Sequence, residues 1–268
     1  MTMTQKTYSD LPAVVRLPLY GFAAVILALL IVPLAAALPI AFNAEPWFRY
    51  PLSGFSWRWF EQLLSSPLWR SAVVNSLIIA ATTTVLATAL GTLAAVALVN
   101  PRFRYRNAVM ALAISPMVVP VVVLGLGLFI CFSPLGLNYT YLGVVLAHTV
   151  LATPFVVVTV TATLTRFDFR LMQAAANLGA GKVMAFRTVM LPIISPGVAA
   201  GAVFAFAASF DEVVMVLFIA GPDQRTLPKQ MFTGLREQLD PTIIAAAGLM
   251  IVLTGLLLAV LRFSTKKR

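Results

Sequence analysis

The longest uncharged stretch of the chain decides its fold class. It runs from Asn107 to Thr165 and reads NAVMALAISPMVVPVVVLGLGLFICFSPLGLNYTYLGVVLAHTVLATPFVVVTVTATLT. As one straight helix its 59 residues would measure about 88 Å, nearly three times the thickness of the hydrocarbon core of a bilayer. The stretch must therefore turn back once, and residues 133–138 supply the proline, glycine and asparagine of such a turn. It predicts two membrane-spanning helices.

The composition extends this prediction to the whole chain. Of its 268 residues 60% are hydrophobic and 10% are charged, and the mean hydropathy is +0.95. A soluble domain does not have such values. The other uncharged stretches bring the expected spans to six, at about residues 18–42, 72–98, 108–132, 141–164, 195–219 and 241–261. We therefore expect an all-α integral membrane protein with a single transmembrane domain over residues 1–268.

The positive charges predict the orientation of these spans, because cytoplasmic loops retain Lys and Arg. With the N-terminus inside, the cytoplasmic segments hold 13 of the 19 basic residues. These are Lys6, Arg16, Arg102, Arg104, Arg106, Arg166, Arg170, Lys182, Arg187, Arg262, Lys266, Lys267 and Arg268. Both termini are therefore expected in the cytoplasm. The basic tail Lys266-Lys267-Arg268 is then an anchor at anionic membrane lipid, and we expect no nucleic-acid partner.

Some residues inside the expected spans disturb helices or bring them close together. Pro116 and Pro120 should bend the third span, because each removes a backbone donor. Gly197 and Gly201 form a small-x-x-x-small pair that lets another helix approach. His148, the single histidine, is expected to hydrogen-bond across helices, with a role in transport as the alternative. The four tryptophans fall in the first outer loop, where an aromatic belt and a docking surface both remain open.

The segment between the fourth and fifth spans, residues 165–192, does not read as a simple loop. From Arg166 onward its sequence is RFDFRLMQAAANLGAGKVMAFRTVMLP. Apolar residues recur at helical spacing up to Leu178, and Gly179 and Gly181 then stop the helix. The pattern predicts two short cytoplasmic helices joined by a glycine elbow. The run of small alanines in the first of them suits docking into a groove of a partner.

This segment carries a resemblance to a known family. Its pattern Q-A-A-x-x-x-G, nine residues, V-x-L-P is similar to the E-A-A-x-x-x-G, nine residues, I-x-L-P signature of the permease subunits of binding-protein-dependent ABC importers. The resemblance implies a type I importer permease fold and a coupling helix that seats on the ATPase. The residues that match are Gln173, Ala174, Ala175 and Gly179, with Leu191 and Pro192 closing the motif. Gln173 stands where the family usually has glutamate, so the charge is absent and the hydrogen-bonding capacity remains.

A second stretch narrows the resemblance. Residues 209–228, SFDEVVMVLFIAGPDQRTLP, are similar to the S-x-D-D-x-V-x-x-x-F-x-x-G-P-x-x-x-x-L-P run of the second membrane subunit of spermidine and putrescine permeases. This likeness implies a polyamine importer of the bacterial inner membrane. Its partners would be a second permease subunit, two copies of an ABC ATPase and a periplasmic binding protein. ATP and Mg would bind to the ATPase, and this chain would hold no cofactor. Opines, aminophosphonates and amino-acid derivatives remain alternative substrates.

Asp211 and Glu212 stand side by side in the fifth expected span, although the chain has only nine acidic residues. Intramembrane acids are functional candidates because their insertion costs roughly 2.5 to 3.5 kcal/mol at the helix centre. We expect Asp211 to line the translocation path as a counter-charge to a cationic amine, and Glu212 to assist it or to pair with the sister subunit. A structural hydrogen bond between subunits is the alternative. On a continuous helix Asp211 would follow the face of Gly197, Gly201, Phe204 and Ala208, which we expect to pack inward. It would lie in the outer half of the bilayer.

Enzymatic readings fit the sequence poorly. Adjacent acids on one helix cannot face each other across a peptide bond as an aspartyl protease requires. The run from Gly179 to Lys182 lacks the preceding glycine and the following Ser or Thr of a phosphate-binding loop. We therefore expect neither catalytic residues nor a metal site. A stand-alone channel or secondary transporter is the remaining alternative, and it predicts transport without ATP.

Overall fold

The structure is a computed structural model that describes residues 13–100, 103–237 and 239–266. Lys6, Arg102, Lys267 and Arg268, which entered the prediction of orientation and of the basic tail, lie outside the described residues. The long helices are α1 (Ala13–Ala37), α3 (Pro67–Leu98), α6 (Tyr141–Leu164), α9 (Leu191–Phe210) and α12 (Thr242–Lys266). The shorter ones are η2 (Leu38–Phe42), α2 (Arg58–Ser65), α4 (Arg106–Val118), α5 (Val121–Phe132), η3 (Ser133–Leu135), α7 (Arg170–Asn177), α8 (Lys182–Ala185), η4 (Phe186–Met190), α10 (Val214–Ile219) and α11 (Leu227–Glu237). The all-α fold class is confirmed.

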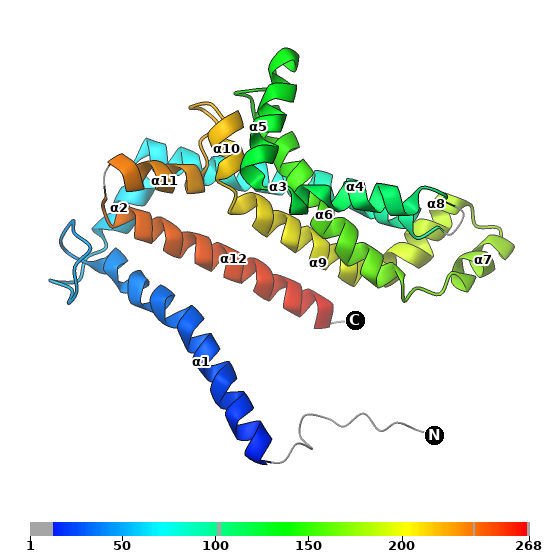
Figure 1. The fold of residues 1–268 in the computed structure, drawn as a ribbon, viewed down its shortest axis with the longest axis horizontal. Helices are drawn as coiled ribbons and strands as arrows, with labels where there is room; N and C mark the ends of the chain where they lie inside the picture. The colour runs from blue at the N-terminus through cyan, green and yellow to red at the C-terminus, as the bar shows by residue number, and fades with distance from the viewer. Residues whose placement is uncertain (1–12, 101–102, 238, 267–268) are drawn as a thin grey trace.

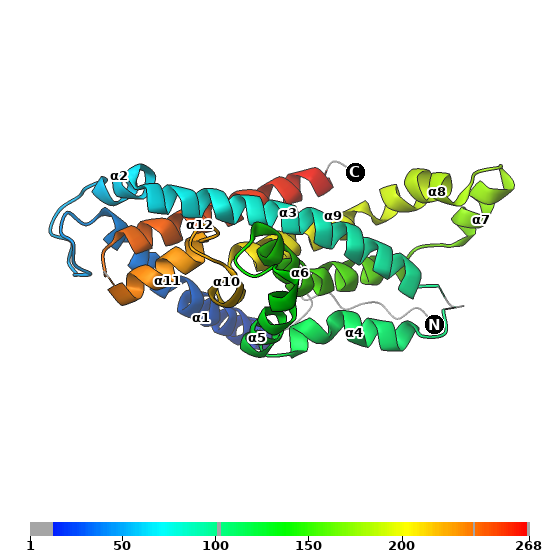
Figure 2. The same cartoon turned by 90° about the horizontal axis from the view of Figure 1, so that it is seen from above.

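The core of the molecule is the packing of α3, α6 and α9, which run alongside one another (Figure 2). Glycines make the close approach possible. A Cβ added at Gly201 would lie 2.6 Å from Thr159 Oγ1, and one added at Gly91 would lie 2.6 Å from the Cβ of Val156. A Cβ at Gly197 would collide with Thr163. The expectation that Gly197 and Gly201 let a second helix approach is confirmed, and that helix is α6.

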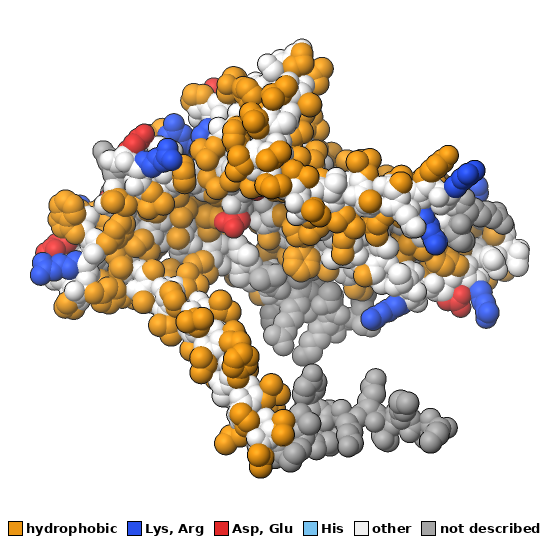
Figure 3. All heavy atoms as spheres, viewed as in Figure 1, with side chains coloured by type: hydrophobic (Ala, Val, Ile, Leu, Met, Phe, Trp, Pro, Cys, Tyr) orange, Lys and Arg blue, Asp and Glu red, His pale blue; other side chains and the backbone are white. Residues whose placement is uncertain are grey.

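The molecule is elongated, and its two ends differ (Figure 1). The short helices α7 and α8 lie at one end of the long axis, whereas α2 and α11 lie at the other. On the face drawn in Figure 3, Lys and Arg side chains gather toward these two ends and hydrophobic side chains cover most of the surface between them. Basic ends with an apolar middle are the pattern of a protein that spans a bilayer.

The long apolar helices occur close to the expected spans. Four are long and apolar enough to cross a membrane, over Val14–Phe42, Pro67–Leu98, Tyr141–Leu164 and Lys182–Phe210. The pair α4–α5 makes a fifth if it is counted as one bent span, and the apolar part of α12 is shorter, over Thr242–Leu257. The chain is therefore a multi-pass membrane protein. The turn expected at residues 133–138 is confirmed, with Gly136 at a φ of 65°.

The third expected span, 108–132, is not one continuous helix. α4 ends at Val118 and α5 begins at Val121, and their axes are bent by 108°. Pro120 is the physical reason, because it lacks an N–H and forces the preceding residue, Val119, into an extended conformation with a ψ of 132°. The bend expected at Pro120 is confirmed. Pro116 lies within α4 and does not end it.

The fifth expected span, 195–219, is also interrupted. α9 begins at Leu191, before the expected start, and ends at Phe210, and α10 begins only at Val214. The continuous helix on which we placed Asp211 and Glu212 is therefore wrong at this point. The expected inward face is wrong in part as well: Gly197 and Gly201 are buried, whereas Phe204 and Asp211 are exposed.

The aromatic loop that we expected on the outer side folds into a small cluster around α2. Phe42, Phe55, Trp57 and Phe60 contact one another with ring centroids 5.0 to 5.8 Å apart. Trp59 is buried, and its Nε1–H donates to the carbonyl of Asn43 at 2.7 Å. Part of this aromatic set is therefore structural core, and Trp57 remains exposed at its edge.

Candidate functional site

The acidic pair occupies the break between α9 and α10, and the two acids have different surroundings. Asp211 follows the last residue of α9, and its backbone N–H still donates to the carbonyl of Ala207 at 3.1 Å. Its side chain is exposed, and the carboxylate accepts no hydrogen bond from any residue that the structure describes. A carboxylate left free in this way is available to a ligand or to another subunit.

Glu212 is half-buried and satisfies the backbone of the next helix. One carboxylate oxygen accepts the N–H of Met215 at 3.0 Å, and the N–H of Val214 also bonds to this side chain. The first N–H groups of a helix lack partners inside it, and an acidic side chain placed there also suits the positive end of the helix dipole. Glu212 therefore caps α10, which explains why the second acid is needed where the helix restarts.

The other end of α10 is capped by a cation. Lys229 Nζ donates to the carbonyl of Ala220 at 2.9 Å and to that of Val216 at 3.4 Å. Burial and the neighbouring Arg225 lower the pKa of Lys229. A six-residue helix is thus held by an acid at its N-terminus and a base at its C-terminus, each opposite to the local charge of the helix dipole.

Asp211 opens onto a cavity of about 480 Å³ between the end of α9 and the middle of α12. The lining residues are Ala207, Phe210, Asp211, Met250, Ile251, Thr254 and Gly255. Asp211 is the one charged residue among them, and Thr254 is the one hydroxyl. Because Met250 to Gly255 lie near the middle of the sixth expected span, the carboxylate lies nearer to mid-span than counting along a continuous helix predicts.

A buried polar contact ties this region to the core. His148 Nδ1 and Ser209 Oγ are hydrogen-bonded at 2.8 Å between α6 and α9, and both side chains are buried. His148 Nε2 has no partner within the described part of the chain. The expected cross-helix hydrogen bond of His148 is confirmed. Sequence reasoning did not single out Ser209 or Thr254, because a lone hydroxyl in an apolar span carries no signal without the fold.

The segment 165–192 forms the expected elbow. Gln173, Ala174 and Ala175 lie in α7, which ends before Gly179 with a φ of 88°. The N–H groups of Gly179 and Ala180 donate to the carbonyls of Ala176 and Ala175, both at 3.0 Å, which is the Schellman arrangement that favours glycine. Two short helices joined by a glycine turn are therefore confirmed.

The exposed side of α7 mixes small alanines with polar side chains. Gln173 and Ala174 are exposed, Ala175 is buried, and Leu178 is 89% exposed. Leu191 and Pro192 lie in the first turn of α9, to which the π-helical turn η4 connects α8. The motif residues thus lie at the two ends of this segment: the first four lie in α7 and its cap, and the last two lie in the first turn of α9.

Comparison with known proteins places this architecture in a family. Residues 87–267 match the model of the binding-protein-dependent transport system inner membrane component. The chain belongs to this family. The permease is accordingly a transport subunit rather than an enzyme, and its assembly implies a second permease subunit, a separate ATPase subunit and a binding protein. No group of three or more His, Cys, Asp or Glu that could hold a metal lies within the described residues.

Curated relatives cover most of the permease. The spermidine/putrescine transport system permease protein PotC of Haemophilus influenzae is 34% identical over 249 residues, which are 92% of the permease and 96% of PotC. PotC of Escherichia coli strain K12 is 33% identical over 234 residues, 87% of the permease and 88% of the relative. The putrescine transport system permease protein PotI of the same strain is 36% identical over 211 residues, 76% and 75% of the two chains. The resemblance read from residues 173–192 and 209–228 is confirmed at the level of the family.

Solved structures share the fold. A chain in the crystal structure of a bacterial ABC transporter involved in the import of the acidic polysaccharide alginate aligns with a TM-score of 0.71 at 17% identity, covering 93% of the permease and 95% of that chain. A chain of the inward-facing MetNI methionine ABC transporter aligns with a TM-score of 0.62 at 17% identity, covering 78% and 97%. The helical arrangement is therefore that of ABC importer permeases.

Proposed function

We propose that the chain is one of two membrane subunits of an ATP-driven importer that takes up polyamines such as spermidine and putrescine. A periplasmic binding protein delivers the ligand, and two copies of an ABC ATPase, which bind ATP and Mg, drive its passage through the bacterial inner membrane. The names of the PotC and PotI relatives support the substrate class. Another amine or organic solute, such as an opine, an aminophosphonate or an amino-acid derivative, is the second candidate.

The observation that carries this proposal is the free carboxylate of Asp211 in the cavity between α9 and α12. Among the described residues no Lys or Arg lines that cavity, so its one charge favours a cation over an anion. A polyamine at neutral pH carries ammonium groups, and a desolvated carboxylate binds such a group by a charge-assisted hydrogen bond. Asp211 then lines the path, and Glu212 assists by holding α10 at the break. Thr254 offers a neutral hydrogen-bonding partner opposite Asp211.

The layout that we propose has six spans with both termini in the cytoplasm, and treats residues 1–268 as a single transmembrane domain. In this layout α4 and α5 together form the bent third span, and α9 and α10 form the interrupted fifth. The shared end of α7 and α8 is then cytoplasmic, which agrees with the position of Arg166, Arg170, Lys182 and Arg187. The exposed aromatic edge at Trp57 lies on the periplasmic side.

In the cytoplasm, α7 would seat on the ATPase. Gln173, Ala174 and the exposed Leu178 form the contact surface, and the Schellman turn at Gly179 fixes the angle at which α7 leaves it. The rigid connection through η4 to Leu191 and Pro192 would carry a movement of the ATPase into α9. Because Asp211 directly follows the last residue of α9, that movement reaches the acid that we place on the path.

The test is Asp211→Asn in the complete transporter reconstituted in liposomes. We expect amine uptake to fall roughly 10- to 150-fold, because a hydrogen bond to a charged partner is worth roughly 1.5 to 3 kcal/mol. Assembly and ATP hydrolysis should persist. Asp223→Asn is the matched control, since Asp223 is an exposed acid outside the cavity. Unchanged uptake kinetics in Asp211→Asn would refute the proposed role of this carboxylate.

The substrate class is tested by loading the binding protein. Binding protein carrying spermidine, putrescine, an opine or an aminophosphonate should be added in turn to the reconstituted complex. We expect stimulation of ATP hydrolysis by the polyamine-loaded protein. If only binding protein loaded with another solute stimulates ATP hydrolysis, that solute replaces the polyamine as the assigned substrate. Uptake by the purified chain without ATP would favour a stand-alone carrier.

A further inference from the structure

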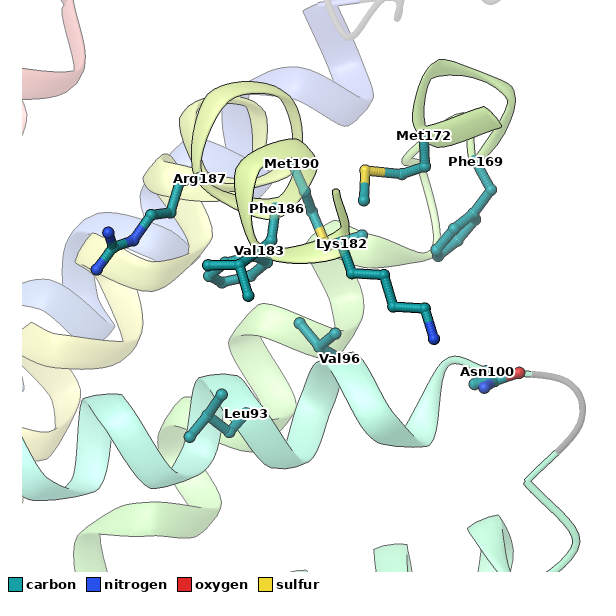
Figure 4. A pocket seen from close by; sticks show the side chains of 10 residues that line it. All are labelled: Leu93, Val96, Asn100, Phe169, Met172, Lys182, Val183, Phe186, Arg187 and Met190. Atoms are coloured by element: carbon teal, nitrogen blue, oxygen red, sulfur yellow. The ribbon is translucent and has the colours of Figure 1, made fainter. Parts of the chain in front are cut away.

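A second cavity lies behind the α7–α8 elbow and away from Asp211. It has a volume of about 740 Å³ and separates the last turns of α3 from the segment that leads into α9 (Figure 4). Leu93 and Val96 point into it from α3, and Phe186 and Met190 of η4 lie across from them. A cavity of this size with apolar walls is large enough for a ligand of several hundred daltons.

The charges around this cavity are of one sign. Lys182 and Arg187 are the charged residues that line it, and both are exposed. Figure 4 shows the Lys182 side chain extending toward Asn100 and the Arg187 side chain extending the other way, on the opposite side of the cavity. Neither side chain forms a hydrogen bond or an ion pair with a residue that the structure describes. Asp168, the only acid of the segment 165–192, does not line the cavity.

The position of the cavity matches the surface of the inner leaflet. Leu93 and Val96 lie in the last two turns of α3, at the end of the second expected span, so the proposed orientation places the apolar walls toward the inner leaflet. At the rim of the cavity Leu93 is 62% exposed and Val183 is 69% exposed. An acyl chain that covered these apolar side chains would remove them from water. Cations above apolar walls at this depth are complementary to a molecule with a negative headgroup and an apolar tail.

We propose that this cavity binds one anionic phospholipid of the inner leaflet, with an acyl chain between α3 and η4 and the negative headgroup at the rim that Lys182 and Arg187 flank. The assignment of the leaflet rests on the proposed orientation of the spans. The lipid would bridge α3 to the segment that joins α7 to α9. Its presence would therefore stiffen the connection between the ATPase contact and the fifth span. The exposed stripe at Gln173, Ala174 and Leu178 stays free for the ATPase, since none of the three lines the cavity.

The test measures lipid binding by the purified complete transporter with native mass spectrometry. Palmitoyl-oleoyl phosphatidylglycerol and the phosphatidylcholine with the same chains are titrated as probes. We expect the wild type to prefer phosphatidylglycerol, and Lys182→Gln with Arg187→Gln to weaken that binding about 30-fold, from about fivefold for each cation near the surface. Phosphatidylcholine binding should change little. Val96→Trp, which fills the cavity, should weaken the binding of both lipids.

The matched control is Arg104→Gln with Arg106→Gln. It removes two exposed cations that do not line the cavity and that the proposed orientation places on the same side of the membrane. An equal loss of phosphatidylglycerol binding in this control means that the attraction is not specific to the cavity, and it overturns the proposal. So does equal binding of both lipids by the wild type. If Val96→Trp displaces the ATPase or the second permease subunit while lipid binding stays intact, the occupant is protein and the proposal is wrong.

These outcomes are separate from those that test the proposed function, because the binding measurement needs neither amine nor ATP. Loss of amine uptake in Asp211→Asn together with equal binding of the two lipids would reject the lipid site alone. Unchanged amine uptake in Asp211→Asn together with preferred binding of phosphatidylglycerol would reject the role of Asp211 alone. If Val96→Trp fails to fold, the paired charge variants decide the outcome.

Discussion

Glu212 gives the sharpest separation between a structural and a substrate-binding acid. It accepts the N–H of Met215 at 3.0 Å and begins a helix of only six residues. Loss of such a capping contact costs about 1 kcal/mol, within a range of roughly 0.5 to 2 kcal/mol. For local opening of α10 this corresponds to an equilibrium constant that is about five times larger. Glu212→Ala should therefore loosen α10 without unfolding the permease.

The matched variant is Glu212→Gln. The glutamine side chain keeps an oxygen that accepts the same N–H, and only the charge is lost. We therefore expect α10 to stay close to the wild type in Glu212→Gln and amine uptake to be largely retained. In Glu212→Ala both the stability of α10 and uptake should decrease.

Hydrogen–deuterium exchange of the peptide that spans residues 214–219, in the reconstituted complex, measures the effect directly. Exchange about five times faster in Glu212→Ala, with wild-type exchange in Glu212→Gln, is the expected result. Equal exchange in all three proteins refutes the capping role. A loss of uptake in Glu212→Gln as large as in Asp211→Asn would mean that the charge of Glu212 itself contacts the substrate.

Three further predictions test other parts of the structure. Gly179→Ala forces an L-residue into a φ of 88° and should destabilise the elbow by about 1 to 2 kcal/mol. The stimulation of ATP hydrolysis by loaded binding protein should then decrease. Gly181 has open space around it and an ordinary φ, so Gly181→Ala should leave this stimulation near the wild type. Gly201→Ala should destabilise the purified complex by about 1 to 3 kcal/mol and lower its melting temperature, because the added Cβ meets Thr159 and the backbone of Val156. Gly127→Ala should not, since nothing lies within 4 Å of that position. Equal melting temperatures of the two variants would contradict the packing. Ser209→Ala removes the partner of His148 and should cost about 0.6 to 1.7 kcal/mol in denaturant-induced unfolding, and no change in the midpoint would show that the hydrogen bond is dispensable.

The parts of the fold that depend on length and local chemistry were predictable from the sequence. The turn after the third span followed from Ser133-Pro134 and Gly136, and the elbow followed from Gly179 after a run of alanines. Each of these signals acts within a few residues. The family resemblance rested likewise on spacing that can be read along the chain.

The interruption at Asp211 and Glu212 could not be predicted in the same way. Their neighbours are apolar and helix-compatible, and no proline or glycine marks the break. The break depends on Glu212 bonding to the backbone of Met215, and α10 is completed by Lys229 from a later helix. The contact of Glu212 is local but has no signature in hydropathy or periodicity, and the cap by Lys229 is a tertiary effect.

The mutual arrangement of the two cavities was also beyond the sequence. Asp211 and Thr254 line the same cavity although 43 positions separate them in the sequence. Leu93 and Phe186 line the other cavity and are 93 positions apart. Which apolar residues line space, and which fill it, depends on the crossing of α3, α9 and α12. The sparse charges of the sequence pointed to Asp211. The cavity that surrounds it became visible only from the packing of α9 and α12.

The paired caps of α10 bear on how a transporter can bend inside a bilayer. Lipid offers no replacement hydrogen bonds, so a loose helical fragment there normally leaves its end groups unsatisfied at a cost of several kcal/mol for each. Glu212 at the break and Lys229 of α11 supply these bonds from protein rather than from lipid. The polar ends of α10 thus stay satisfied where α9 stops, so a joint in the fifth span carries little electrostatic penalty.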